Sequence, residues 1–178
     1  MPMERGFTNR GFTLVELLVV IAISTVAGVV AFINIGSFRN DQDLQTGAQN
    51  LIGFIRTAQA NASSNVKCGT EGGAAWFVEV VNSTTVDLKC QTSTQTLKIN
   101  SLQQKPNIQI SSISGSTSCF PTTIRFSSLS GNVNFETSAI GCFSSDMQSI
   151  PLTVQNTFQT GTNTKNVVIN KGGSVYVQ

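Results

Sequence analysis

Glu16 is the residue whose chemistry most needs an explanation, because it is the only charged residue between Phe12 and Ile35. The rest of that stretch is almost entirely apolar. A carboxylate deep in an apolar environment costs up to about 3 kcal/mol, so its presence calls for a reason. A place in the first turn of a helix lowers this cost, since the helix dipole favours an anion there. Helix capping alone and a specific function for Glu16 are therefore both open.

The tetrapeptide Arg-Gly-Phe-Thr occurs twice, at residues 5–8 and 10–13. The first copy is followed by polar residues. The second copy, which contains Gly11 and Phe12, is followed directly by the apolar run, with Glu16 as the fifth residue counted from Phe12. Only the second copy therefore stands where a recognition sequence at the head of a helix would be expected.

The composition excludes several kinds of catalytic and binding site. The chain has 178 residues, a net charge of +2 and 11% charged residues, which argues against a polybasic nucleic-acid binder. Histidine is absent, and this removes the Ser-His-Asp and Cys-His nucleophiles and the histidine-containing zinc sites. The carboxylates show no metal-loop spacing. We therefore predict no enzymatic activity, cofactor or metal site, with a membrane-anchored exported enzyme as a remaining alternative.

Four cysteines are present, at spacings of 22, 29 and 23 residues: Cys68, Cys90, Cys119 and Cys142. None forms a CxxC pair, so a zinc ribbon or a redox motif is not indicated. In an exported domain an even number of cysteines predicts two disulfides, with three possible connectivities. Proximity along the chain favours Cys68–Cys90 and Cys119–Cys142, and four separate buried thiols are the alternative.

The apolar run from Leu17 to Ile33 reads LLVVIAISTVAGVVAFI. Residues 12–35 are long enough to cross the roughly 30 Å hydrocarbon core as a helix. Arg5 and Arg10 precede the run, so we expect the N-terminus in the cytoplasm and residues 36–178 outside. A cleaved secretory signal is the main rival, but no small-x-small site follows the run. A plain single-pass anchor explains the length of the run but not Glu16.

The helix is expected to continue beyond the apolar run as an amphipathic segment over residues 36–65. Apolar residues recur there at alternating spacings of four and three, which predicts one buried face. These residues are Leu44, Ala48, Leu51, Ile55, Ala58 and Ala62. No proline follows until Pro106, so one continuous helix from about 12 to 63 is possible.

Residues 66–178 are predicted to form a β-rich head. Short strand patterns separated by turn residues indicate a mostly antiparallel sheet or sandwich, and the whole chain is α+β. The expected strands are 75–81, 86–90, 96–100, 107–113, 123–127, 132–136, 152–156, 167–170 and 174–177. The expected core residues are Phe77, Val80, Ile99, Ile108, Ile110, Ile124, Phe126, Val133, Phe135, Val168 and Val175.

The segment Gly11-Phe12-Thr13-Leu14-Val15-Glu16, at the head of its apolar helix, resembles the class III signal of type IV pilins and type II secretion pseudopilins. The resemblance implies that a prepilin peptidase removes residues 1–11 as a leader, cutting between Gly11 and Phe12, and that Phe12 is then N-methylated. It also implies that Glu16 pairs with the amino terminus of a neighbouring subunit in a filament. The implied partners are other pilin or pseudopilin subunits, the peptidase, an assembly platform of the bacterial inner membrane, and membrane lipid before assembly.

Three further spans are similar to minor pilins and pseudopilins of the GspH/FimT type: residues 51–68, 123–135 and 166–178. In the first span Arg56 is displaced from the usual pattern. This resemblance implies a pilin-like fold, in which a long N-terminal helix packs on the sheet of the head, and a minor structural subunit. A pilus-tip module that binds DNA or a surface is the alternative. At the C-terminal glycine turn, where basic residues would serve DNA binding, only Lys165 and Lys171 remain, with Lys98 and Lys105 expected nearby. The kind of secretion or pilus machine stays open.

Overall fold

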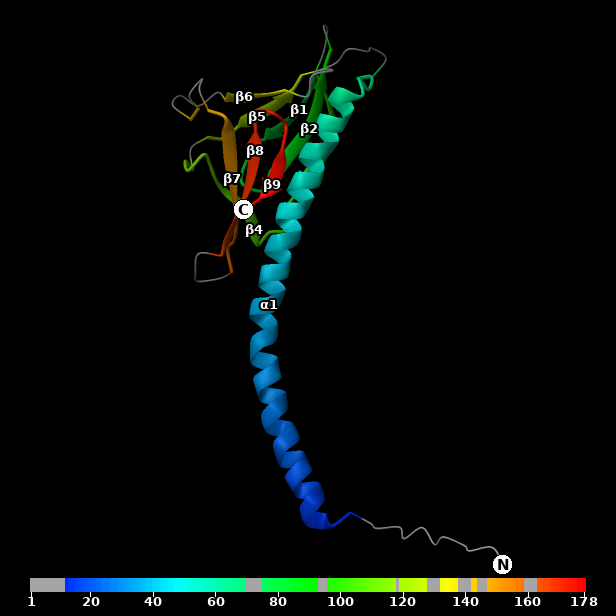
Figure 1. Cartoon of the computed structure of the whole chain (residues 1–178), viewed down its shortest axis with the longest axis vertical. Helices are drawn as coiled ribbons and strands as arrows, with labels where there is room; N and C mark the ends of the chain where they lie inside the picture. The colour runs from blue at the N-terminus through cyan, green and yellow to red at the C-terminus, as the bar shows by residue number, and fades with distance from the viewer. Residues whose placement is uncertain are drawn as a thin grey trace, which may run out of the picture. The chain divides into compact units, whose positions relative to one another are not determined.

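The computed structural model describes residues 12–69, 75–92, 96–117, 119–127, 132–137, 142–143, 147–158 and 163–178. The chain divides into two compact units, residues 1–39 and residues 40–178. The first unit contains the N-terminal part of the helix α1 (Leu14–Ser63), and the second contains the rest of α1 and the strands (Figure 1).

The helix α1 begins at Leu14 and ends at Ser63, which confirms the expected continuous helix to within two residues. Thr13 caps its N-terminus, and a turn follows its last residue. In the described part of the chain, no helix has a stretch apolar and long enough for a membrane crossing. The expected crossing by residues 12–35 is therefore not confirmed and stays a prediction.

The described strands of the head form two antiparallel sheets (Figure 1). The five-stranded sheet has the order β3-β2-β1-β5-β6, and the four-stranded sheet has the order β4-β7-β8-β9. The bounds are β1 Ala75–Val80, β2 Thr85–Gln91, β3 Thr96–Gln103, β4 Ile108–Ile113, β5 Thr122–Phe126, β6 Val133–Thr137, β7 Ser149–Asn156, β8 Thr164–Asn170 and β9 Val175–Val177. Each expected strand is present, and the choice between one sheet and two is settled in favour of two.

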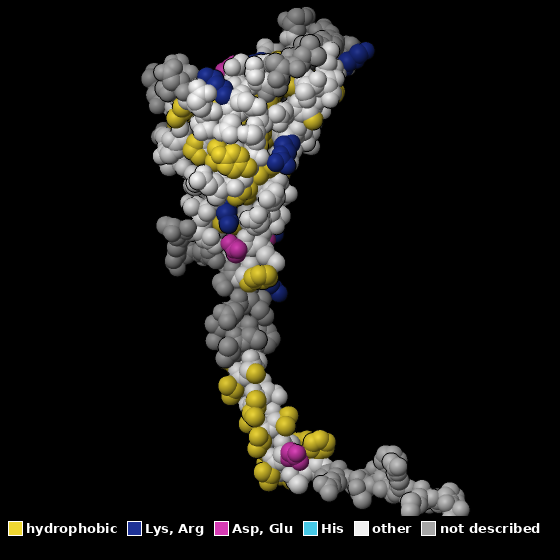
Figure 2. Space-filling view, viewed as in Figure 1, with side chains coloured by type: hydrophobic (Ala, Val, Ile, Leu, Met, Phe, Trp, Pro, Cys, Tyr) yellow, Lys and Arg dark blue, Asp and Glu magenta, His cyan; other side chains and the backbone are white. Residues whose placement is uncertain are grey.

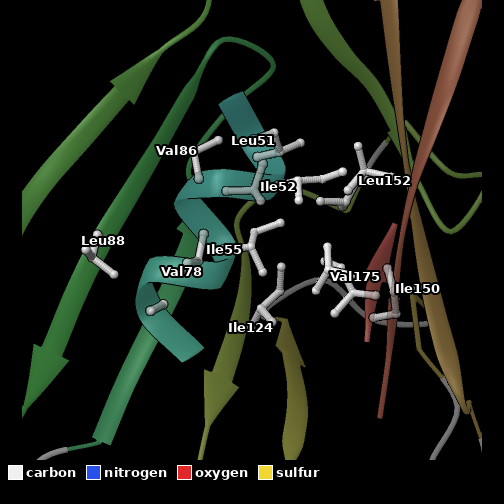
Figure 3. Close-up of a cluster of buried hydrophobic side chains, with 14 of the residues drawn as sticks. Leu51, Ile52, Ile55, Val78, Val86, Leu88, Ile124, Ile150, Leu152 and Val175 are labelled. Atoms are coloured by element: carbon white, nitrogen blue, oxygen red, sulfur yellow. The ribbon is translucent and has the colours of Figure 1, made fainter. Parts of the chain in front are cut away.

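The second half of α1 supplies the middle of a core shared with both sheets. All six residues of the predicted apolar stripe, from Leu44 to Ala62, are fully buried. Figure 3 shows Leu51, Ile52 and Ile55 between side chains of the two sheets. Val78, Val86 and Leu88 come from the five-stranded sheet, and Ile150, Leu152 and Val175 come from the four-stranded sheet. The helix therefore holds the two sheets together as well as leading into the head.

Ile99 is a wrong prediction, because it is 49% exposed instead of buried. The pairing of β3 with β2 shifts at this point: Asn100 pairs with Leu88 and Lys98 pairs with Lys89, so Ile99 has no opposite residue. Such a β-bulge changes the direction of the side chains that follow it. Phe135 is only partly buried, and the other predicted core residues are buried.

We expect Gly47→Ala to destabilise the head, while the same change at Gly53 stabilises it. A Cβ at position 47 would lie 2.7 Å from Ile108 Cγ2 and 3.2 Å from Gln104 Oε1. Overpacking of this kind costs about 1–3 kcal/mol, more than the ~1 kcal/mol that alanine gains over glycine in a helix. A Cβ at position 53 meets nothing within 4 Å, so only the higher helix propensity of alanine affects the stability of this variant.

The measurement is the urea midpoint of the detergent-solubilised chain, followed by the fluorescence of Trp76, which is 3% exposed. Gly53→Ala is the matched control within the same helix. A midpoint that rises equally in both variants would show that α1 and β4 are not packed as tightly as described.

Candidate functional site

The N-terminal end of α1 combines Phe12, Thr13 and Glu16. The Glu16 backbone N–H donates to the Thr13 hydroxyl at 3.3 Å and lies 3.1 Å from the Thr13 carbonyl oxygen. Thr13 is thus the N-cap and Glu16 is the third helical residue, the positions that a capping box occupies. The predicted site residue Gly11 lies outside the described residues.

Thr13 is a functional residue that sequence reasoning missed. The signal for it was present, since Thr13-Leu14-Val15-Glu16 has the Thr-x-x-Glu spacing that marks a helix start. The cap fixes the start of the helix. Thr13 lies between Phe12 and Leu14, which is the first helical residue. It thereby places the Glu16 carboxylate in the first turn, as predicted.

The helix segment that follows the cap is apolar on all sides. Seven large apolar side chains between Leu14 and Ile21 are each at least half exposed: Leu14, Val15, Leu17, Leu18, Val19, Val20 and Ile21. Figure 2 shows hydrophobic side chains gathered along this part of α1. A helix that is apolar all round requires an apolar environment, either lipid or other helices. The segment is therefore built to be covered by something outside the chain.

Glu16 carries a charge into this apolar segment without a visible counter-charge. Among the described residues, the ion pairs are Lys89–Glu79, Lys98–Asp87, Lys105–Asp43 and Arg125–Glu136, and all of them lie in the second unit. None of them includes Glu16. A cation that neutralises Glu16 in an apolar environment must therefore come from beyond the described part of the chain.

The four cysteines form two disulfides, Cys68–Cys90 and Cys119–Cys142, which confirms the pairing that proximity favours. The Cα atoms are 5.8 Å and 5.7 Å apart, within the usual range for disulfides. The first bridge ties the chain just after α1 to strand β2. The second joins the segments that flank the β5–β6 pair. The disulfides therefore belong to the framework of the head.

Two polar residues of α1 anchor the C-terminal hairpin. The Arg56 guanidinium donates to the Val175 carbonyl at 2.9 Å, and the Gln59 side chain donates to the Gly173 carbonyl at 3.0 Å. Arg56 is thus a structural residue that joins α1 to strand β9, and Gln59 joins α1 to the turn that precedes β9. Sequence reasoning noted only its displacement from the usual pattern and gave it no partner.

The lysines considered for DNA binding do not come together. Lys98 lies on the edge strand β3 of the five-stranded sheet and pairs with Asp87. Lys105 pairs with Asp43 at 2.6 Å, and its hydrogen bond lowers the pKa of that carboxyl group. Lys165 lies on β8 of the other sheet, and Lys171 follows that strand. Lys98 and Lys105 are thus each paired with a carboxylate, which reduces the positive charge open to phosphate contacts.

We expect the stability of the head to fall in acid partly through Asp87. Burial acts to raise the pKa of Asp87, but hydrogen bonds from Lys98 at 2.9 Å and Ser101 at 2.7 Å outweigh it, and the pKa lies below its usual value. A lowered pKa in the folded state stabilises the fold above the unfolded pKa of about 3.9. This stabilisation is lost as the pH falls from there through the folded-state pKa.

The test compares Asp87→Asn with the unchanged chain in urea at about pH 6 and about pH 2.5. Asp87→Asn should lower the free energy of unfolding by about 1–3 kcal/mol at the higher pH and change it little at the lower pH. Ser101→Ala removes one donor and keeps the charge, so it should show part of the effect. An equal loss of unfolding free energy at both pH values would mean that the charge of the Asp87 carboxylate contributes nothing to the stability of the head.

The N-terminal site lies within a segment that matches a known family model. Residues 7–32 match the family model described as the prokaryotic N-terminal methylation motif. No curated protein and no solved structure matches the chain. The match covers Gly11, Phe12, Thr13 and Glu16 together with the apolar segment, and it ends before the head begins. The chain therefore carries a prokaryotic N-terminal methylation motif over residues 7–32.

Proposed function

We propose that this chain is a minor structural subunit of a type IV pilus or a type II secretion pseudopilus, of the GspH/FimT kind. A prepilin peptidase removes residues 1–11, Phe12 is N-methylated, and the processed subunit joins a helical filament. The observation that carries this proposal is the methylation motif over residues 7–32, which contains Gly11, Phe12 and Glu16 in one segment.

Before assembly the subunit resides in the bacterial inner membrane, with its N-terminus in the cytoplasm and its head outside. This placement is supported by Arg5 and Arg10 ahead of the apolar run and by the disulfides of the head, which persist in an oxidising compartment. The assembly platform of that membrane then transfers the apolar segment from lipid to the core of the filament.

In the filament, Glu16 supplies the counter-charge for the amino group of Phe12 on a neighbouring subunit. Both groups leave water when apolar helices pack around them, and each would be costly there alone. The all-round apolar surface of the segment and the absence of a described cation beside Glu16 support this role. The head has no part in chemistry and acts as a displayed, disulfide-linked domain.

The test of processing uses the two copies of Arg-Gly-Phe-Thr as target and control. The chain is expressed with and without prepilin peptidase, and the intact mass of the membrane-extracted protein is measured. With the peptidase we expect loss of residues 1–11 and the addition of one methyl group. Gly11→Val should abolish cleavage, because a branched side chain obstructs approach to the bond where glycine leaves it open.

Gly6→Val makes the same change in the first copy and should leave cleavage intact. A protein that keeps residues 1–11 in the presence of the peptidase would contradict the proposal. So would a protein cut after the apolar run, which would instead be a secreted head.

A further inference from the structure

The outer face of the four-stranded sheet carries no charged side chain among the described residues. Residues directly opposite each other on neighbouring strands share a face, so the strand register separates the outward side chains from the core. The outward side chains of β4, β7, β8 and β9 are Ser, Thr, Asn, Gln, Pro, Val and Tyr only. Lys165 on β8 belongs to the other face, because it lies opposite Val154, which is fully buried.

The outer face of the five-stranded sheet is different, because three ion pairs lie on it. They are Lys89–Glu79, Lys98–Asp87 and Arg125–Glu136. The two outer faces of the head thus differ in charge. A charged partner would lose hydration on the neutral face without gaining a counter-charge, so this face is complementary to an uncharged partner.

A row of three apolar side chains crosses the neutral face. Pro151 on β7 lies opposite Val168 on β8, and Val168 lies opposite Tyr176 on β9. Tyr176 is 46% exposed, Val168 is 7% exposed, and Pro151 is half-buried. Neighbouring strands lie about 4.8 Å apart, so the row extends over about 10 Å. Figure 2 shows hydrophobic side chains gathered on the head over β7, β8 and β9.

The apolar row is stiff. Pro151 has a closed ring, Val168 is branched at Cβ, and tyrosine has only two rotatable side-chain bonds. The Pro151 carbonyl accepts the Ser114 N–H at 2.8 Å where the pairing of β4 with β7 ends, which holds the ring in place from the backbone. A ligand that covers the row therefore costs little side-chain entropy.

Hydrogen-bonding side chains lie on both sides of the apolar row, about 7 Å along the strands. On one side the Thr153 hydroxyl donates to Asn166 Oδ1 at 3.0 Å. On the other side Asn170 Nδ2 donates to the Ser174 hydroxyl at 2.6 Å. Each of these amides and hydroxyls has more hydrogen-bonding capacity than one bond uses. The row is therefore flanked by groups that can also bind the hydroxyls of a ligand.

This arrangement matches the surface of an uncharged glycan. A pyranose ring with equatorial hydroxyls presents C–H bonds on its two faces and hydroxyls around its edge. The C–H faces can pack on the apolar row while the edge hydroxyls reach the flanking side chains. One ring of an extended β-linked chain is close in length to the spacing between strands, so the row can hold about two rings. A nucleic acid or an acidic polysaccharide would instead bring charges that nothing on this face neutralises.

We propose that the outer face of the four-stranded sheet binds an extended, uncharged glycan of β-linked pyranose rings. Tyr176, Val168 and Pro151 contact the faces of the rings, and the amides and hydroxyls beside them bind the ring hydroxyls. All of these residues lie in the second compact unit. The inference goes beyond the proposed function, because it gives the displayed head a ligand of its own.

The experiment titrates the full chain with cellohexaose and measures the heat of binding, in a zwitterionic detergent that has no sugar headgroup. We expect weak, saturable binding that does not depend on salt, and no binding of the acidic counterpart hexagalacturonate. Tyr176→Ala should weaken the binding about tenfold, whereas Tyr176→Phe keeps the ring and should retain most of it. Ile99→Ala is the matched control, because Ile99 is 49% exposed on the other sheet.

The urea midpoint of each variant, followed by Trp76 fluorescence, shows whether the head is still folded. A folded chain that does not bind cellohexaose, or a folded Tyr176→Ala variant that binds it equally well, would overturn the proposal. Preferential, salt-sensitive binding of hexagalacturonate would overturn it too. Self-association that Tyr176→Ala abolishes, without any binding of cellohexaose, would show that a second copy covers this face. None of these results affects the processing of the N-terminus, which is measured separately by mass.

Discussion

Glu16→Ala is expected to yield a processed, membrane-inserted subunit that fails to enter the filament. Without the carboxylate, the amino group of Phe12 on a neighbouring subunit is buried with no partner. Removing one member of a buried ion pair costs about 3–5 kcal/mol, which corresponds to a fall of roughly two to four orders of magnitude in incorporation. The measurement is the fraction of the subunit in sheared filaments relative to the membrane, by immunoblot, in cells that express the remaining filament subunits.

Two further variants separate the ion pair from other effects of this substitution. Thr13→Ala removes the N-cap hydroxyl and leaves Glu16 in place, so it should cost about 1 kcal/mol and reduce incorporation only modestly. Asp41→Ala removes an exposed carboxylate from the same helix and should leave incorporation unchanged. Equal losses of incorporation for Thr13→Ala and Glu16→Ala would assign Glu16 to helix capping. They would refute the proposed ion pair between Glu16 and the Phe12 amino group of a neighbouring subunit.

The parts of the fold that sequence predicts well are those that depend on local periodicity. The stripe from Leu44 to Ala62 has the spacing of one helix face, and any partner that covers this face buries the same six residues. The strands were found from alternation between turn residues. In both cases the pattern lies within about twenty consecutive residues, so no knowledge of the partner is required.

Features that depend on distant pairing could not be predicted in the same way. Ile99 has the sequence environment of a core residue, and only the shift in pairing between β3 and β2 leaves it exposed. The division into two sheets depends on β1 pairing with β5, although three strands lie between them in the sequence. Arg56 is exposed by its place on the helix, and its partner Val175 lies 119 residues away.

The candidate site was predictable because its signal is contiguous. Gly11, Phe12 and Glu16 stand within six residues at the head of the apolar run, and the matched motif contains all three. The cap at Thr13 is marked only by the Thr-x-x-Glu spacing, which the charge of Glu16 overshadows in a sequence.

Removing either disulfide is expected to destabilise the head by about 3 kcal/mol. The bridged residues are separated by 22 and 23 positions, and closing loops of this length restricts the unfolded chain by similar amounts. The variants are Cys68→Ser with Cys90→Ser, and Cys119→Ser with Cys142→Ser. Free energies of unfolding in urea, followed by Trp76 fluorescence, should fall by nearly equal amounts, and by about twice as much when all four residues are replaced.

A difference in stability between the two variants would not come from loop length, because the two loops are nearly equal. Cys68, Cys90 and Cys119 are fully buried, so each serine leaves a polar group in the core, and a larger loss than expected would measure that burial. The Cys68–Cys90 bridge connects the segment after α1 to β2, which is paired on both sides, whereas Cys119–Cys142 flanks the β5–β6 pair, in which β6 is an edge strand. No loss for the second pair would show that the unfolded chain already holds the β5–β6 hairpin together.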